Sequence, residues 1–137
     1  MKRPGRRTFL GVLLGPAFAA LASACAKPFK FPPPTTPRVG YVQEGVASWY
    51  GPGYHGKRTS SGEVYDQDAL TAAHVNFTFG TRVKVTLLST HRSVVVRIND
   101  RFPSHKGRVI DLSRGAARQI GLIGPGTGVV RMEVVGS

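Results

Sequence analysis

Between residues 62 and 100 the sequence offers four candidates for acid/base chemistry: Glu63, Asp66, His74 and Asp100. They stand among small, aromatic and strand-forming residues rather than on a charged surface helix. The chain has only seven carboxylates against nineteen Lys and Arg, so these three acidic candidates in one segment need a chemical explanation. Cleavage of a sugar–sugar bond requires a carboxyl that gives and takes a proton. The pattern therefore indicates an acid/base site of the kind that cleaves carbohydrates.

Each of these residues also has a structural alternative. Asp100 can cap the turn after a strand, and Asp66 can form an Asx-turn with the backbone that follows it. Glu63 and His74 can serve only as hydrogen-bonding residues. Our hypothesis makes Asp100 the acid/base, with His74 and Asp66 positioning it or the sugar, and Glu63 tuning the local charge or binding substrate.

Neither a metal nor a cofactor is predicted. The spacing of His55, His74 and His105 matches no compact zinc signature, and the chain's single cysteine, Cys25, lies outside the expected domain. The sequence also lacks a phosphate-binding glycine loop, a serine-hydrolase elbow and a dinucleotide fingerprint.

Aromatic side chains near the acidic residues are candidates for stacking on sugar rings, with core packing as the alternative. Trp49 and Tyr50 adjoin on one expected strand, so at most one of them should face the site. Tyr54 lies in a glycine-rich loop and is freer to contact substrate, and Tyr65 is a further candidate.

Short runs rich in β-branched residues predict a mainly β domain with barrel-like strand spacing, with strands expected at 45–50, 82–88, 93–99 and 129–135. In the second run Val83, Val85 and Leu87 alternate with polar residues, as expected when one face of a sheet is buried. One or two short helices are expected, the clearest from 113 or 114 to 120, with Ser113 as N-cap and Gly121 ending it.

Residues 1–25 have the basic start and apolar middle of an export signal. The small residues before Cys25 predict lipidation at that cysteine, and an ordinary signal peptidase site is the alternative. The paired arginines leave the general and twin-arginine export routes both open. The Pro-rich residues 26–43 are expected to form an extended tether, and residues 44–137 a single folded domain.

The expected domain is itself basic. The signal removes four of the nineteen basic residues and none of the seven acidic ones, which leaves fifteen against seven, or +8. In the cell envelope this charge favours a carboxylate-bearing wall polymer or anionic lipid as partner rather than nucleic acid. We expect a monomer held on the periplasmic side of the inner or outer membrane by its lipid. No apolar run after Cys25 is long enough to span a bilayer.

Several motifs together resemble the rare lipoprotein A family. Four lie in the first half of the domain: 45–51 (GVASWYG), 55–59 (HGKRT), 61–66 (SGEVYD) and 70–74 (LTAAH). Five more follow in the family's order: 79–81 (FGT), 94–101 (VVVRINDR), 107–108 (GR), 110–113 (IDLS) and 130–134 (VRMEV).

This resemblance implies a six-stranded double-psi β-barrel, related to expansins, that acts as an exported lytic transglycosylase on peptide-poor peptidoglycan strands. It places Glu63, Asp66, His74 and Asp100 in the catalytic groove. In such a reaction the 6-hydroxyl of N-acetylmuramic acid (MurNAc) attacks its own anomeric carbon and forms a 1,6-anhydro ring. Arg97 and Arg101 can bind the muramic carboxylate or pair with Asp111 or Glu133.

Two features depart from the family pattern. Phe102 stands where glycine is common, which is expected to narrow the groove. The sequence ends at Ser137 without the glycan-binding repeat that many members carry, so septal recruitment is not expected. The rival interpretation is an expansin-like module that binds peptidoglycan without cleaving it.

Overall fold

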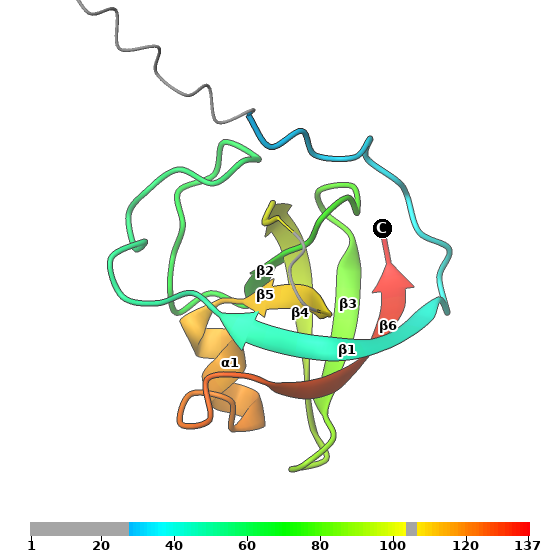
Figure 1. Ribbon diagram of the computed structural model, residues 1–137, viewed down its shortest axis with the longest axis vertical. Helices are drawn as coiled ribbons and strands as arrows, with labels where there is room; N and C mark the ends of the chain where they lie inside the picture. Colours follow the sequence, from blue (N-terminus) through cyan, green and yellow to red (C-terminus); the bar gives the residue numbers. More distant parts are fainter. Residues whose placement is uncertain (1–27, 104–106) are drawn as a thin grey trace, which may run out of the picture.

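The computed structural model describes residues 28–103 and 107–137, so the expected export signal, Cys25 and His105 lie outside the described residues. Six strands and one helix make up the fold (Figure 1). In chain order they are β1 Val42–Trp49, β2 Thr71–Ala73, β3 Arg82–Leu87, β4 Arg92–Asp100, β5 Arg108–Leu112, α1 Arg114–Ile120 and β6 Gly128–Gly136.

The strands form a closed barrel in the order β1-β5-β2-β4-β3-β6. Two pairs are parallel, β1 with β5 and β2 with β4, and the other pairs are antiparallel. Closure removes the free sheet edges that would otherwise expose unpaired backbone groups. The mainly β barrel expected from the sequence is confirmed, with one helix among the described residues.

The interior is filled by alternate side chains of the strands. On β3 the buried residues are Val83, Val85 and Leu87, while Arg82 and Lys84 are exposed, as the alternation in the sequence predicted. On β6, Val130 and Met132 are also buried. Burial of this aliphatic core contributes about 25 cal/mol per Å² of apolar surface and fixes the strand register.

Helix α1 packs against the barrel through its alanine-rich face and contacts β4 and β1. The Ser113 hydroxyl accepts a hydrogen bond from the Ala116 backbone N–H, and Gly121 ends the helix in the left-handed conformation with φ 81°. Both caps agree with the prediction.

The chain joins the barrel earlier than the boundary predicted after residue 43. Strand β1 already begins at Val42. Before it, the Thr35 N–H donates to the Asn76 carbonyl at 2.7 Å, the Thr35 carbonyl accepts from the Thr78 N–H at 3.0 Å, and Pro37 is buried. Residues 28–34, before this docked segment, are exposed along the outside of the barrel. The Pro-rich composition concealed this docking because the contacts are made mainly by the backbone.

Candidate active site

The Asp100 carboxylate lies at the end of β4 and is held by three segments of the chain. Its Oδ1 accepts hydrogen bonds from the Ser60 N–H at 2.9 Å and the Arg101 N–H at 2.8 Å. Its Oδ2 accepts from the Tyr50 hydroxyl at 2.8 Å. The turn-capping role considered for Asp100 is thus real, yet it uses one oxygen and leaves the other directed toward the tyrosine.

A pocket of about 340 Å³ opens beside this carboxylate. Its lining comprises Trp49, Tyr50, Gly51, Tyr54, Asp100, Arg101, Phe102, Pro103 and Asp111. We call it the two-aspartate pocket. The prediction that at most one of Trp49 and Tyr50 faces the site is wrong, because β1 ends at Trp49 and the alternation of a strand no longer governs the next residue.

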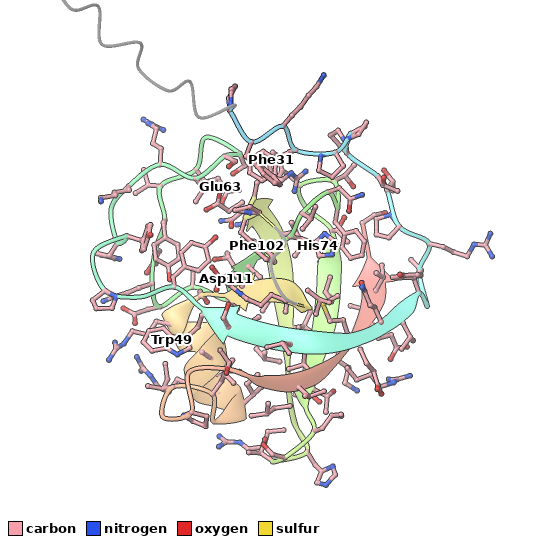
Figure 2. All side chains as sticks on the ribbon, viewed as in Figure 1. Phe31, Trp49, Glu63, His74, Phe102 and Asp111 are labelled. Atoms are coloured by element: carbon pink, nitrogen blue, oxygen red, sulfur yellow. The ribbon has the colours of Figure 1, made fainter. Side chains whose placement is uncertain are left out.

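Asp111 is the site residue that the sequence interpretation missed. The sequence offers Asp111 only as one of two possible ion-pair partners for Arg97 or Arg101, yet it shares the pocket with Asp100. The two aspartates are both cross-strand partners of Ala73, one on β4 and the other on β5. With neighbouring strands about 4.8 Å apart, two strand spacings separate their backbones by about 10 Å. Figure 2 shows Asp111 between Trp49 and Phe102.

The surroundings of Asp111 favour its protonated form. Its side chain is only 16% exposed. Burial raises the pKa of the Asp111 carboxyl, and the negative charge of Asp100 adds to this, against the hydrogen bond from Ser48 at 2.9 Å and the attraction of Arg108. A carboxyl with a raised pKa in a pocket is suited to deliver a proton.

Tyr50 links the two-aspartate pocket to an aromatic cluster. Its ring stacks on Tyr65, with centroids 4.6 Å apart and planes 17° apart, and meets Tyr54 edge-on at 5.8 Å. Burial and the nearby Asp100 carboxylate raise the pKa of the Tyr50 phenol far above its usual value. Tyr50 therefore stays protonated and donates to Asp100. Tyr65 lies behind it and lines a separate pocket of about 330 Å³ with Trp49.

Glu63 lies outside the two-aspartate pocket and pairs with Arg97. The Arg97 Nη2 donates to Glu63 Oε2 at 2.9 Å, and the Asn99 amide donates to the same oxygen at 3.2 Å. Hydrogen bonds from Arg97 and Asn99 lower the pKa of Glu63. This carboxylate is thus an ionised partner beside the strand that ends in Asp100. Arg97 pairs with Glu63 instead of the two acids considered from the sequence.

Asp66 adopts the Asx-turn considered as its alternative, because its Oδ1 accepts from the Asp68 N–H at 2.9 Å. Its side chain is exposed and lines none of the three described pockets. No described hydrogen bond or pocket joins the Asp66 side chain to the other predicted site residues. Its role in catalysis therefore stays a prediction.

His74 is joined to Asp100 through the backbone, since its N–H donates to the Asp100 carbonyl at 3.1 Å. Its imidazole faces a different cavity. The ring Nδ1 accepts from the backbone N–H groups of Asn76 and Phe77 at 3.2 and 3.1 Å. Burial, with a smaller effect of the Arg101 charge, lowers the pKa of His74 to about 4. His74 is therefore neutral at pH 7.

Within residues 28–103 and 107–137, no group of three His, Cys, Asp or Glu side chains is placed to hold a metal ion. Over the same residues there is no helix with the length and apolar character to cross a bilayer.

The sequence profile of the lytic transglycolase family matches residues 42–134, which covers the whole barrel from β1 into β6. The chain belongs to this family. The family is named for cleavage of glycosidic bonds, a reaction that a buried acid in a pocket of this kind can perform. The matched residues include both Asp100 and Asp111.

Relatives support the family assignment at high identity. The chain is 56% identical over 103 residues to the endolytic peptidoglycan transglycosylase RlpA of Campylobacter jejuni, across 75% of this chain and 38% of that protein. It is 61% identical over 94 residues to a probable RlpA of Synechocystis, across 69% of this chain and 29% of that protein. The resemblance to rare lipoprotein A is confirmed. The chain spans about a third of the length of these curated relatives.

The family's double-psi barrel is also confirmed by a solved structure. The expansin of Clavibacter michiganensis superposes with a TM-score of 0.55 at 20% identity, over 69% of this chain and 50% of that one. At this identity the likeness shows the fold alone.

Two further residues shape the two-aspartate pocket. Phe102 is 6% exposed and packs with Tyr50 and Tyr65 while lining the pocket. Arg101 also lines that pocket, and its guanidinium lies 4.1 Å above the Phe79 ring. The Arg101 Nη1 also donates to the backbone carbonyls of His74 at 3.4 Å and Asp100 at 3.5 Å. A cation held in this way can attract an anionic substrate to the pocket.

Proposed function

We propose that this chain is an endolytic lytic transglycosylase that cleaves the bond between MurNAc and N-acetylglucosamine (GlcNAc) in peptide-poor peptidoglycan strands. The observation that carries the proposal is the pairing of Asp100 and Asp111 across Ala73 in one pocket. Family membership and the names of the relatives support the same reaction. The basic charge of the chain suits a polymer that carries muramic carboxylates.

In the proposed mechanism Asp111 is the proton donor. Its raised pKa keeps the carboxyl protonated to a higher pH than that of an ordinary aspartate, and that proton passes to the glycosidic oxygen as the bond to the muramic anomeric carbon breaks. The leaving GlcNAc end thereby gains a neutral hydroxyl. This assignment differs from the one made from the sequence, which gave the acid role to Asp100.

Asp100 faces the positive charge that develops at the anomeric carbon. Hydrogen bonds from Tyr50, Ser60 and the Arg101 backbone fix its carboxylate before substrate arrives, so no reorganisation is needed in the transition state. Its negative charge also contributes to the raised pKa of Asp111. Asp111 thus supplies the proton, and Asp100 supplies the negative charge.

The muramic 6-hydroxyl then completes the reaction. Its oxygen bonds to the anomeric carbon, and its proton returns to the Asp111 carboxylate, which restores the starting state. One carboxyl serves first as acid and then as base, so no water molecule is consumed. Trp49 and Tyr54, both on the pocket wall, supply flat surfaces on which the sugar rings stack.

The three remaining predicted site residues act from outside this pocket in our proposal. Glu63 fixes Arg97 and Asn99 beside the end of β4. His74 holds the Asp100 backbone through its N–H. Asp66 shapes the loop after Tyr65. They are positioning residues, whose loss should change the rate through Asp100 or the loop.

We also propose that the protein is exported and anchored by a lipid on Cys25, as a monomer at the envelope. The exposed residues 28–34 then form the spacer between that anchor and the barrel. Labelling with a palmitate analogue in cells, with Cys25→Ser as the control, tests the anchor. Label retained in the Cys25→Ser variant contradicts it.

The reaction is tested by incubating the purified full chain with denuded glycan strands and analysing the soluble products by mass spectrometry. We expect 1,6-anhydro muramic ends from the native chain and none from Asp111→Asn. Reducing ends would identify a hydrolase. Strands that bind without being cut would identify the expansin-like module.

The pH profile of the cleavage rate separates the roles of the two aspartates. If Asp111 is the acid, Asp100→Asn leaves a slow reaction whose basic limb moves to lower pH, because the charge that raised the Asp111 pKa is gone. If Asp100 is the acid instead, Asp100→Asn should remove the basic limb of the pH profile, whereas Asp111→Asn should only shift it.

A further inference from the structure

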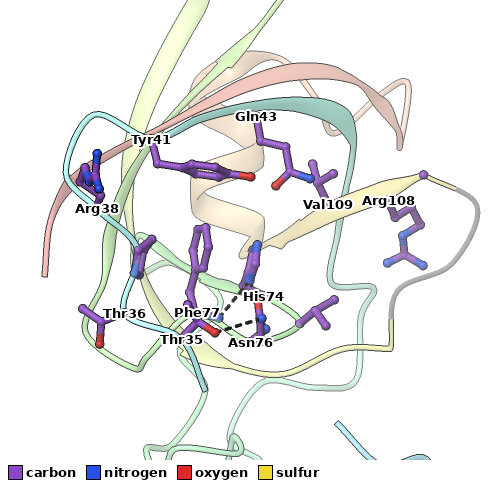
Figure 3. A pocket seen from close by; sticks show the side chains of 13 residues that line it. Thr35, Thr36, Arg38, Tyr41, Gln43, His74, Asn76, Phe77, Arg108 and Val109 are labelled. Atoms are coloured by element: carbon purple, nitrogen blue, oxygen red, sulfur yellow. Dashed lines mark hydrogen bonds between the residues drawn. The ribbon is translucent and has the colours of Figure 1, made fainter. Parts of the chain in front are cut away.

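The largest described cavity, about 660 Å³, lies next to the two-aspartate pocket but shares none of its lining. Figure 3 shows its wall, where Tyr41 and Gln43 face His74 and Phe77, and Arg108 and Val109 close one side. Its size falls within the roughly 300–1,000 Å³ typical of small-molecule sites. We call it the His74 cavity.

The His74 cavity and the two-aspartate pocket are direct neighbours. The Arg108 guanidinium, in the wall of the first, lies 5.2 Å above the ring of Phe102, which lines the second. His74 and Asp100 are joined by a backbone hydrogen bond of 3.1 Å. A linear polymer whose scissile bond lies at Asp100 can therefore place a following unit in the His74 cavity.

The wall made by the segment before β1 is pre-formed. Thr35 pairs with Phe77 as an isolated bridge, and its backbone bonds to Asn76 and Thr78 on both sides. Pro37 is buried in the same wall. Because this wall is already ordered, a ligand that enters the cavity does not have to order it, and the entropy cost of binding is small.

His74 offers the cavity one fixed hydrogen-bond donor. The residue is only 6% exposed, and its ring stacks on Phe77 with centroids 3.6 Å apart. Because Nδ1 accepts two backbone N–H groups, the neutral ring carries its proton on Nε2, at the opposite edge. Among the described residues, Nε2 has no hydrogen-bond partner. An oxygen atom of a bound ligand could accept the hydrogen bond that this Nε2–H group donates.

The charge of the lining selects for an anion. Arg38 and Arg108 belong to it, and no Asp or Glu is found among the described residues that surround the cavity. Tyr41, Phe77 and Val109 add apolar surface, against which a sugar ring or an acetyl methyl group can pack.

We infer that the His74 cavity is a subsite for a carboxylate-bearing N-acetylated sugar unit of the glycan strand, adjacent to the bond being cleaved. The inference rests on the proposed function. The Nε2–H of His74 donates to a carbonyl or hydroxyl oxygen of that sugar, and the arginines attract its carboxylate. Recognition then requires a muramic unit whose carboxylate carries no peptide.

Binding to the non-cleaving Asp111→Asn full chain tests the inference. The probes are the GlcNAc–MurNAc disaccharide, uncharged chitobiose and a free stem peptide, each titrated by NMR. We expect the muramic disaccharide to shift the amide signals of Gln43, Phe77 and Val109. Its Kd should be lower than that of chitobiose, and the stem peptide should leave these signals unchanged.

Two variants in the same background measure the contacts. Arg38→Ala should weaken the muramic disaccharide roughly fivefold and leave chitobiose unchanged, since an exposed charge pair contributes about 1 kcal/mol. His74→Asn keeps an acceptor near the Nδ1 position and loses the Nε2 donor, so both sugars should bind about tenfold more weakly. Arg131→Ala, whose guanidinium pairs with Glu133 on β6, is the matched charge control. Thermal unfolding of each variant checks that it is folded.

The inference is overturned if the disaccharide shifts only signals of the two-aspartate pocket, if Arg38→Ala and Arg131→Ala affect binding equally, or if the stem peptide occupies the cavity. Cleavage by the native chain is measured in parallel. Anhydro products without binding in the His74 cavity leave the proposed function intact and remove only this subsite. A native chain that yields no anhydro products refutes the proposed function itself.

Discussion

Replacing Tyr50 by phenylalanine tests whether Asp100 must be fixed for catalysis. The change removes one hydroxyl, which lies 2.8 Å from Asp100 Oδ2, and keeps the ring that stacks on Tyr65. A hydrogen bond to a charged group contributes about 1.5–3 kcal/mol. Asp100 is only partly buried, so water can replace part of the lost hydrogen bond, and we expect a loss of about 1.5 kcal/mol.

If that energy is used to orient the carboxylate in the transition state, kcat falls about tenfold with little change in KM. The same lost bond should lower the melting temperature by roughly 6–12 °C, because about 1 kcal/mol corresponds to 4–8 °C in a domain of this size. Release of 1,6-anhydro muramic products from denuded glycan strands over time gives kcat and KM, and calorimetry gives the melting temperature.

The matched control is Ser93→Ala, which removes a side-chain hydrogen bond of 2.7 Å between β3 and β4 on the exposed face of the barrel. It should leave kcat unchanged. A Tyr50→Phe enzyme that loses stability and yet cuts glycan at the native rate refutes the reasoning, because Asp100 would then need no tyrosine to hold it.

Three further predictions concern stability. Gly115→Ala should destabilise the protein by about 1–3 kcal/mol in urea unfolding, although alanine normally favours a helix, because the added Cβ would lie 2.6 Å from the Asp68 carbonyl oxygen; Gly124→Ala, in open space, should stay within about 0.5 kcal/mol of the native value. Because the folded state lowers the His74 pKa from 6.5 to about 4, the unfolded chain takes up this proton first, so the His74 contribution to stability is lost as pH falls through that window. At pH 5 the loss amounts to about 2 kcal/mol of the free energy of unfolding. The prediction is wrong if the difference in unfolding free energy between the native protein and His74→Asn does not change with pH. Glu63→Gln should cost no more than about 1 kcal/mol, since the ion pair is nearly half exposed, and 1 M salt should reduce that cost; a larger, salt-independent loss would show that the pair is structural.

The sequence predicted the elements whose signals are local. The alternation of Val83, Val85 and Leu87 identifies β3, and Ser113 with Gly121 brackets α1, because burial period and capping depend on residues a few positions apart. The motifs likewise pointed to Asp100 at the end of a strand, and the structure places it in the lining of the two-aspartate pocket.

The features that the sequence did not reveal depend on contacts between distant segments. Strand β2 has three residues, too few for any periodic signal. The docking of Thr35 is made through backbone atoms, which composition does not report. Asp111 follows a buried residue, as many surface acids do, and only its register against β2 shows that it faces Asp100 across the pocket.

That register shows why the barrel can make this site at all. Strand β2 runs parallel to β4 and antiparallel to β5, and Ala73 is the cross-strand partner of Asp100 on one side and of Asp111 on the other. Residues in one row of a sheet project from the same face. Ala73 itself is buried beneath Tyr50, Tyr65 and Phe102, so a larger side chain there would displace the rings that border the two-aspartate pocket. The irregularity between Ala72 and Ala73 is what aligns the row, since a slip of one residue would turn one of the aspartates to the other face.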